Sequence, residues 1–266
     1  MEVTGKTRYH YIGHSMGTLS YYTACNYHKW VCDNTKLMVG YGPHTVIPNL
    51  FSPLFRIMSE FSDDIHWLLD HAGLYDFAPS NWLVRYLADE VCDRLEKSID
   101  SRLKSSDCLV CRKRLKKEIC GNILFLVAGY NSNEMNSTLL PYIVGHTPAG
   151  TSSLNMIHYS QSVTNGGWAG YDWKDADKNM ARWNSVTPPV YQYDNITAPV
   201  ALYWSDNDWL VVPTDVATLA NKLPNLVTVI SLPVLSLLLS ELICICLQTL
   251  KTHAALLANN WTIIWL

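Results

Sequence analysis

Charged side chains are scarce in this chain of 266 residues. Asp, Glu, Lys and Arg make up 16% of it, against about 25% in ordinary globular proteins. Apolar residues make up 48%, which excludes a disordered chain, because disorder requires low hydrophobicity and high net charge. The composition instead suits one large domain or two small ones with a sizeable buried core.

A basic excess is also missing. The 20 Lys and Arg residues are outnumbered by 23 Asp and Glu residues, and the formal net charge is −3. Nucleic acid is therefore not an expected partner, because phosphate backbones are bound through clustered positive charge. We interpret the one short basic run, at 112–117, as a solvated helix face.

The cysteines do not complete a metal-binding pattern. Cys108 and Cys111 form half of a zinc motif, but no second pair of Cys or His follows at ligand spacing, so we expect no metal site. The eight cysteines also fall below the density of a disulfide scaffold.

Signals for the cellular compartment disagree. Residues 1–6 lack the charged and then apolar pattern of a secretory signal peptide. Glycosylation sequons at Asn136, Asn195 and Asn260 nevertheless favour a secreted or lumenal chain.

Hydrophobic patterning predicts strands and helices that alternate along the chain. An aromatic and β-branched segment at 9–12 is expected to form a buried strand, followed by a turn at 13–17. The other predicted elements are a helix from 16 to about 28, helices at 63–73 and 81–97, a core strand at 198–204 and a helix at 215–223.

An apolar segment at 226–247 carries one charge, Glu241, and one proline, Pro233. Its 22 residues are long enough to cross a bilayer, which needs about 20 apolar residues. A buried strand followed by a core helix explains the same composition. Both interpretations stay open on the sequence.

The motif that carries chemistry is Gly13-His14-Ser15-Met16-Gly17, a G-x-S-x-G pattern between a predicted strand and a predicted helix. This context is typical of a nucleophile elbow, in which a strained turn lifts the serine hydroxyl above the sheet and the flanking glycines leave room for the helix. The amide of Met16 would donate to a developing oxyanion at the helix N-terminus. The alternative is an ordinary turn serine. For His14 we expect a packing or hydrogen-bonding role, because adjacent residues in such a turn point apart.

Together with two further motifs, the elbow resembles the acid lipases, the gastric and lysosomal lipase family of the α/β-hydrolase superfamily. These motifs are Gly-His-Thr-Pro-Ala-Gly-Thr-Ser at 145–152 and Tyr-Trp-Ser-Asp-Asn-Asp-Trp-Leu at 203–210, and the resemblance runs from about Thr7 to about Val227. It implies an α/β fold: a partial α/β-hydrolase core, with an incomplete and mostly parallel sheet, and a large, mostly helical cap or lid insertion. The implied division is core at 1–44, cap at 45–191, core at 192–225 and an atypical apolar tail at 226–266.

The resemblance also implies roles for individual residues. Ser15 matches the acylated nucleophile and Asp208 the carboxylate that orients the catalytic histidine. For Asp206 we expect a loop-capping role. Cys111 and Cys120 match the position of the family's disulfide, which favours an oxidising compartment.

Further properties follow from the same resemblance. The implied activity is hydrolysis of triacylglycerols or cholesteryl esters through an acyl-serine intermediate, without a metal or organic cofactor. The implied location is secreted or lysosomal, with glycosylation expected at Asn136 and Asn195. Contact with a membrane or lipid interface is expected, with 226–247 as a possible anchor.

Two departures from the family's pattern qualify these expectations. The chain begins one strand before the nucleophile, without the family's His-Gly oxyanion loop, which suggests an N-terminally truncated member. His253 is the only histidine after Asp208 and lacks the family's flanking residues, so it is either the base or incidental. Two alternatives to an esterase therefore stay open: an inactive lipase-like fragment or isoform that binds lipid, and a membrane-anchored interaction protein.

Overall fold

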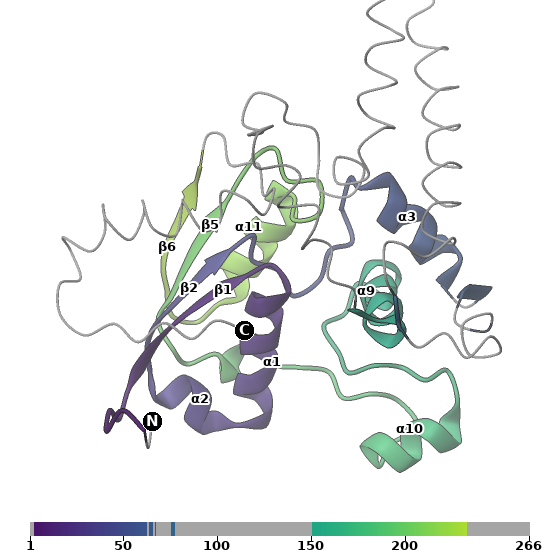
Figure 1. Cartoon of the computed structure of the whole chain (residues 1–266), viewed down its shortest axis with the longest axis horizontal. Coiled ribbons are helices and arrows are strands. Elements are labelled where there is room, and N and C mark those ends of the chain that lie inside the picture. The colour runs from purple at the N-terminus through teal and green to yellow at the C-terminus, as the bar shows by residue number, and fades with distance from the viewer. Residues whose placement is uncertain (1–2, 63, 66, 68–75, 78–150, 233–266) are drawn as a thin grey trace, which may run out of the picture.

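The computed structural model describes residues 3–62, 64–65, 67, 76–77 and 151–232, drawn in colour in Figure 1. Several expectations concern other residues and lie outside this part of the chain. They are the helix at 81–97, most of the helix at 63–73, the Cys111–Cys120 disulfide, the Asn136 and Asn260 sequons, residues 233–247 of the apolar segment, and His253.

A parallel four-stranded sheet forms the core. It is built from β1 (Tyr9–His14), β2 (Thr35–Tyr41), β5 (Val200–Trp204) and β6 (Leu226–Ser231), in the order β1-β2-β5-β6. Each neighbouring pair is parallel. Parallel strands need crossover connections, and helices supply them here. The predicted α/β class is confirmed.

Helices cover one face of this sheet. They are α1 (Met16–Tyr27), which ends one residue before its predicted end, α2 (Lys29–Asp33) and α11 (Pro213–Lys222) (Figure 1). The main apolar cluster lies between them and the strands, and includes Tyr22, Met38 and Leu202, each fully buried. Burial of such side chains supplies about 1.5–3 kcal/mol each, which fixes the helices on this face.

The opposite face of the sheet has its own smaller cluster. It contains Val39, Tyr41, Ala201 and Tyr203, and the rings of Tyr41 and Tyr203 stack with centroids 5.1 Å apart. Side chains alternate between the faces along each strand, so β2 and β5 contribute to both clusters.

Strand β1 is less buried than the sequence suggested. Five of its six residues are partly exposed and only Gly13 is fully buried. In the described part of the chain β1 pairs with β2 alone, so it lies at the edge of this sheet. Aromatic and β-branched composition predicted the strand correctly but does not report its position in the sheet.

The apolar segment that begins at Leu226 is not helical at its start. Its first six residues form β6, which pairs with β5 through Val200 and Leu226 and onward. The sheet therefore extends to Ser231, into the segment expected to be a tail. Among the residues that the structure describes, no helix is both long and apolar enough to cross a membrane.

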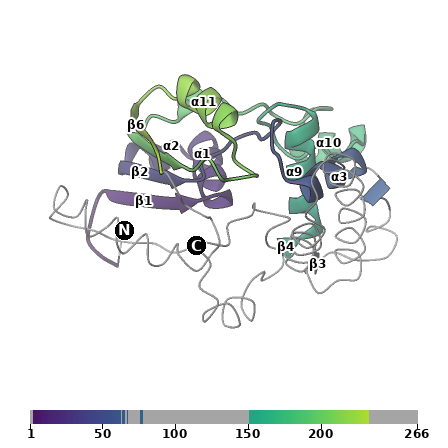
Figure 2. The same cartoon turned by 90° about the horizontal axis from the view of Figure 1, so that it is seen from above.

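A second group of helices lies beyond the carboxyl ends of the strands (Figures 1 and 2). It consists of α3 (Pro53–Glu60), α9 (Ser153–Thr164), which packs on α3, and α10 (Ala176–Trp183). Two short strands, β3 (Asp76–Phe77) and β4 (Thr151–Ser152), pair antiparallel, and the short helix η1 (Tyr193–Asn195) leads into β5. This group falls within the predicted cap, whose boundaries stay predictions.

Candidate active site

Ser15 lies in a strained turn between β1 and α1. Its backbone has φ 48° and ψ −115°, a conformation that L-residues with a side chain rarely adopt. The turn is held from both sides. The Ser15 amide donates to the Tyr41 carbonyl oxygen (2.8 Å), and the Thr18 hydroxyl donates to the Ser15 carbonyl oxygen (2.7 Å). The strand, strained serine and helix have the arrangement of a nucleophile elbow.

The two glycines of the motif differ in what they accommodate. A Cβ on Gly13 would lie 2.8 Å from the Tyr11 Cε1 atom and 3.0 Å from the Gly17 carbonyl carbon. A Cβ on Gly17 would meet only the Tyr11 hydroxyl, at an ordinary 3.8 Å. Only Gly13 is therefore required for helix α1 to approach the strand, and the expectation that both glycines provide clearance holds for one of them.

Met16 is the first residue of α1, and the first amides of a helix have no partner within the helix. Its backbone N–H is therefore available to an incoming anion, and the helix dipole favours negative charge at the same point. The Met16 side chain is 41% exposed. These features fit the donor role that the sequence suggested.

Asp208 lies at the same edge of the sheet as Ser15. Gly13 pairs with Gly40, and Gly40 pairs with Leu202, so β1, β2 and β5 end side by side. Ser15 follows β1 directly, and Asp208 follows β5 by four residues. In open parallel sheets, ligand sites gather at the carboxyl ends of the strands.

The Asp208 carboxylate is only 4% exposed and held in one orientation. Its Oδ1 accepts hydrogen bonds from the Leu210 amide (2.8 Å) and the Val211 amide (3.0 Å). Burial raises the pKa of Asp208 to about 6, and these two amide bonds offset only part of that effect. The carboxylate is thus fixed in place but poorly solvated, and a nearby cation would stabilise its charged form.

Asp206 does not have the loop-capping role that was expected of it. Its side chain is exposed. The loop is closed by the amide bonds to Asp208 and by the Asn207 amide, which donates to the Ser205 hydroxyl (3.4 Å), so the residue predicted as the catalytic acid also caps the loop.

No histidine in the described part of the chain has a hydrogen bond to Ser15 or Asp208. His14 points its Nε2 into a buried site without a partner there, and burial lowers the pKa of His14 to about 4. His253, the proposed base, lies outside the described residues.

His44, in the loop after β2, is a buried histidine near the elbow that the sequence analysis missed. Its Nδ1 donates to the Gly42 carbonyl (3.4 Å), so its Nε2 accepts from the Tyr159 hydroxyl of α9 (3.1 Å). Its backbone amide donates to the Thr18 hydroxyl (3.3 Å). Burial also lowers the pKa of His44 to about 4, so His44 is a poor base. Its hydrogen bonds instead link the loop after β2 to helix α9 of the predicted cap. The sequence signal that could have identified His44 was its position just after the end of a strand.

The structure contains a disulfide that was not predicted. Cys25 in α1 and Cys32 in α2 are joined, with Cα atoms 5.4 Å apart, and both are buried. Asn195 is exposed in η1, and its amide nitrogen donates to the Asn26 side-chain oxygen (2.9 Å). Within the described residues, no group of three or more His, Cys, Asp or Glu side chains could hold a metal ion.

The parallel sheet and the strained serine between β1 and α1 define the class of protein: this is a partial α/β-hydrolase core. No family model matches the chain. A soluble variant of monoglyceride lipase from Saccharomyces cerevisiae aligns with 95% of this chain and 64% of its own, at 12% identity and a TM-score of 0.46, too low to bear on the chemistry.

Sequence relatives are more specific. Lipase lipl-1 of Caenorhabditis elegans is 32% identical over 217 residues, which cover 81% of this chain and 49% of the lipase. Human lysosomal acid lipase/cholesteryl ester hydrolase is 29% identical over 86% of this chain and 52% of its own. Mouse gastric triacylglycerol lipase is 29% identical over 85% and 52%. The resemblance to the gastric and lysosomal acid lipases is thus confirmed, and the chain spans about half the length of these relatives.

Proposed function

We propose that this protein hydrolyses carboxylic esters of neutral lipids through an acyl-serine intermediate. The observation that carries the proposal is the strained backbone of Ser15, at the same sheet edge as the buried carboxylate of Asp208. Relation to lipases supports the same chemistry.

The reaction assigns one role to each group. The Ser15 oxygen attacks the ester carbonyl while a histidine takes its proton, and the Met16 amide donates to the resulting oxyanion. The C–O bond to the alcohol then breaks, and the histidine returns the proton to that leaving oxygen. Water, activated by the same histidine, releases the acid and restores Ser15.

Asp208 would orient that histidine and stabilise its charged form. We assign the base to His253, which follows Asp208 in the order Ser, Asp, His of α/β-hydrolases. An imidazolium beside the Asp208 carboxylate would offset the cost of burial that raises its pKa.

The proposed substrates are long-chain esters of glycerol or a sterol, after the names of the relatives. We also propose a secreted or lysosomal location. The Cys25–Cys32 disulfide supports it, because disulfides persist in oxidising compartments, and the exposed Asn195 sequon is compatible with glycosylation there.

A labelled fluorophosphonate tests the nucleophile directly, because it reacts only with an activated serine. We expect the full chain to be labelled, Ser15→Ala to lose all label, and Ser20→Ala, one turn further along α1, to keep it. His253→Ala should lower the labelling rate at least roughly 100-fold. Absence of labelling in a folded wild-type chain would refute the esterase proposal.

The second candidate is a lipid-binding protein without hydrolytic activity. It is favoured by the lack of any hydrogen bond from a described histidine to Ser15 or Asp208. Incubation with radiolabelled trioleoylglycerol separates the two: binding without released oleate favours the second candidate.

A further inference from the structure

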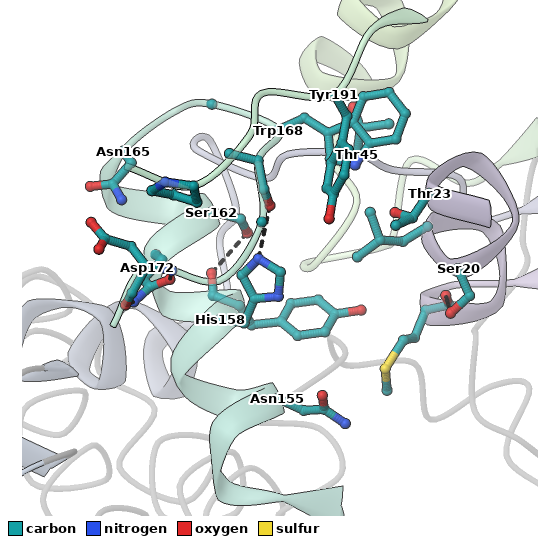
Figure 3. Close-up of a pocket in the computed structure, with 18 of the residues that line it drawn as sticks. Ser20, Thr23, Thr45, Asn155, His158, Ser162, Asn165, Trp168, Asp172 and Tyr191 are labelled. Atoms are coloured by element: carbon teal, nitrogen blue, oxygen red, sulfur yellow. Dashed lines mark hydrogen bonds between the residues drawn. The ribbon is translucent and has the colours of Figure 1, made fainter. Parts of the chain in front are cut away.

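A crevice of about 520 Å³ separates the elbow helix α1 from the cap helix α9 (Figure 3). Residues 167–170 close it on a third side, together with Pro188 and Tyr191. Its volume falls in the range of about 300–1,000 Å³ that is usual for small-molecule sites. Ser15 is not among its lining residues, so the crevice is not simply the space in front of the nucleophile.

One face of α1 forms the first wall. Met16, Ser20, Thr23 and Tyr27 line it, at the spacing of residues that share a helix face. The wall therefore begins at the residue after the nucleophile and follows α1 to its last residue. A ligand along it would be elongated and would contact mainly hydrocarbon and small hydroxyl groups.

The second wall presents a hydrogen-bond acceptor. The His158 Nε2 lies 3.0 Å from the Ala169 carbonyl oxygen, so it carries a proton and donates. In the neutral ring, Nδ1 is then an acceptor. Burial lowers the pKa of His158 and keeps the ring neutral. Figure 3 shows the ring on the crevice side of α9.

Charge complementarity narrows the choice of ligand. Among the described residues that line the crevice there is no Lys or Arg, and the one carboxylate belongs to Asp172. That carboxylate already accepts from the Asn179 side chain (2.9 Å) and pairs with Lys174 (3.5 Å). An anionic head group would find no Lys or Arg here, whereas a hydroxyl would find the His158 acceptor.

We propose that this crevice binds a neutral lipid alcohol of the monoacylglycerol class. The acyl chain lies along the α1 wall and a glycerol hydroxyl donates to the His158 Nδ1. The proposal goes beyond the hydrolysis proposed above, because it requires neither the Ser15 hydroxyl nor a catalytic base.

Calorimetric titration of the full-length Ser15→Ala chain tests the proposal without turnover of the ligand. The probes are 1-octanoylglycerol, sodium octanoate and methyl octanoate, which share one acyl chain. We expect a single saturable site for 1-octanoylglycerol. Methyl octanoate, which lacks the donor, should bind roughly 5-fold more weakly, and octanoate at least roughly 10-fold more weakly.

Blocking variants locate the site. Thr23→Trp fills the crevice and should abolish binding, whereas Thr218→Trp on the exposed face of α11 should leave it unchanged. If Thr23→Trp does not fold, Ser20→Trp fills the crevice from a more exposed position on the same helix.

Equal affinity for octanoate and 1-octanoylglycerol, binding that survives the blocking variant, or no saturable binding at all would each overturn the proposal. Failure of the esterase proposal is separate, because it is scored by labelling of the wild-type Ser15.

Discussion

Replacement of Asp208 by asparagine should stabilise the fold at neutral pH. The carboxyl has a pKa of about 6 in the folded protein, because its burial disfavours the charge, against an ordinary value of 3.8. At pH 8 the buried group is ionised, and the difference between these values corresponds to about 3 kcal/mol of lost stability. The carboxylate is 4% exposed, so solvent screens little of this cost.

The sign of the pH dependence follows from proton binding. Between pH 3.8 and about 6 the folded chain holds a proton on Asp208 that the unfolded chain has released. The contribution of Asp208 to stability therefore falls as pH rises through this window, and it is constant above and below it. An amide side chain at this position does not titrate, so the advantage of Asp208→Asn should vanish near pH 4 and reach about 1–3 kcal/mol above pH 7.

Urea unfolding followed by tryptophan fluorescence, at five pH values from 4 to 8, measures the difference. Asp206→Asn is the matched control, since Asp206 is exposed two residues earlier in the same loop and should change stability by less than about 0.5 kcal/mol. If Asp208→Asn destabilises the fold equally at every pH, Asp208 is a structural cap whose charge costs nothing, and the inference that burial raises its pKa is refuted.

The buried histidines should limit stability on the acid side. Folded pKa values of about 4 for His14 and His44 lie below the ordinary 6.5, so the unfolded chain binds the protons first as pH falls. Their contribution is complete above pH 6.5 and is lost as pH falls towards 4. The two histidines together outweigh Asp208, so wild-type stability should rise with pH and level off above about pH 6.5, and His44→Gln should weaken the loss at low pH.

Three further comparisons of variants probe the elbow and its helix. Gly13→Ala should destabilise by about 1–3 kcal/mol through its contact with Tyr11, while Gly17→Ala should stabilise by about 0.5–1 kcal/mol; equal effects would contradict the steric account. Ser15→Gly should be about 1 kcal/mol more stable than Ser15→Ala in urea unfolding, because only glycine adopts φ 48° without strain; no difference would mean a relaxed turn. Loss of the Cys25–Cys32 link in a double Ala variant should cost about 2.5 kcal/mol, and dithiothreitol should destabilise the wild type by more than it destabilises that variant.

The local elements were largely predictable because their determinants are local. β1 and β5 follow from aromatic and β-branched runs, and α1 begins where the motif ends. The strained turn follows from the order strand, glycine, serine, helix, since Gly13 alone allows helix and strand to approach closely. The relation to the acid lipases was likewise visible in short motifs. It was confirmed by sequence identity to lipases over more than 80% of this chain.

The pairing of cysteines and of strands could not be predicted from local sequence. Eight cysteines allow many disulfides, and only the packing of α2 against α1 brings Cys25 to Cys32. Hydropathy could not show that the apolar segment begins with a strand, because anchors and strands are both rich in apolar residues and only pairing with β5 identifies residues 226–231 as a strand.

The sequence by itself determined a turn with Ser15 at its apex, in which Gly13 leaves room for the following helix. The tertiary structure decided what that serine faces. Parallel register of β1, β2 and β5 brings Ser15 and Asp208 to one edge, and burial of the loop after β5 changes the acidity of Asp208. The physical reason is that backbone geometry is set by neighbours in the chain, whereas desolvation and proximity depend on groups distant in sequence.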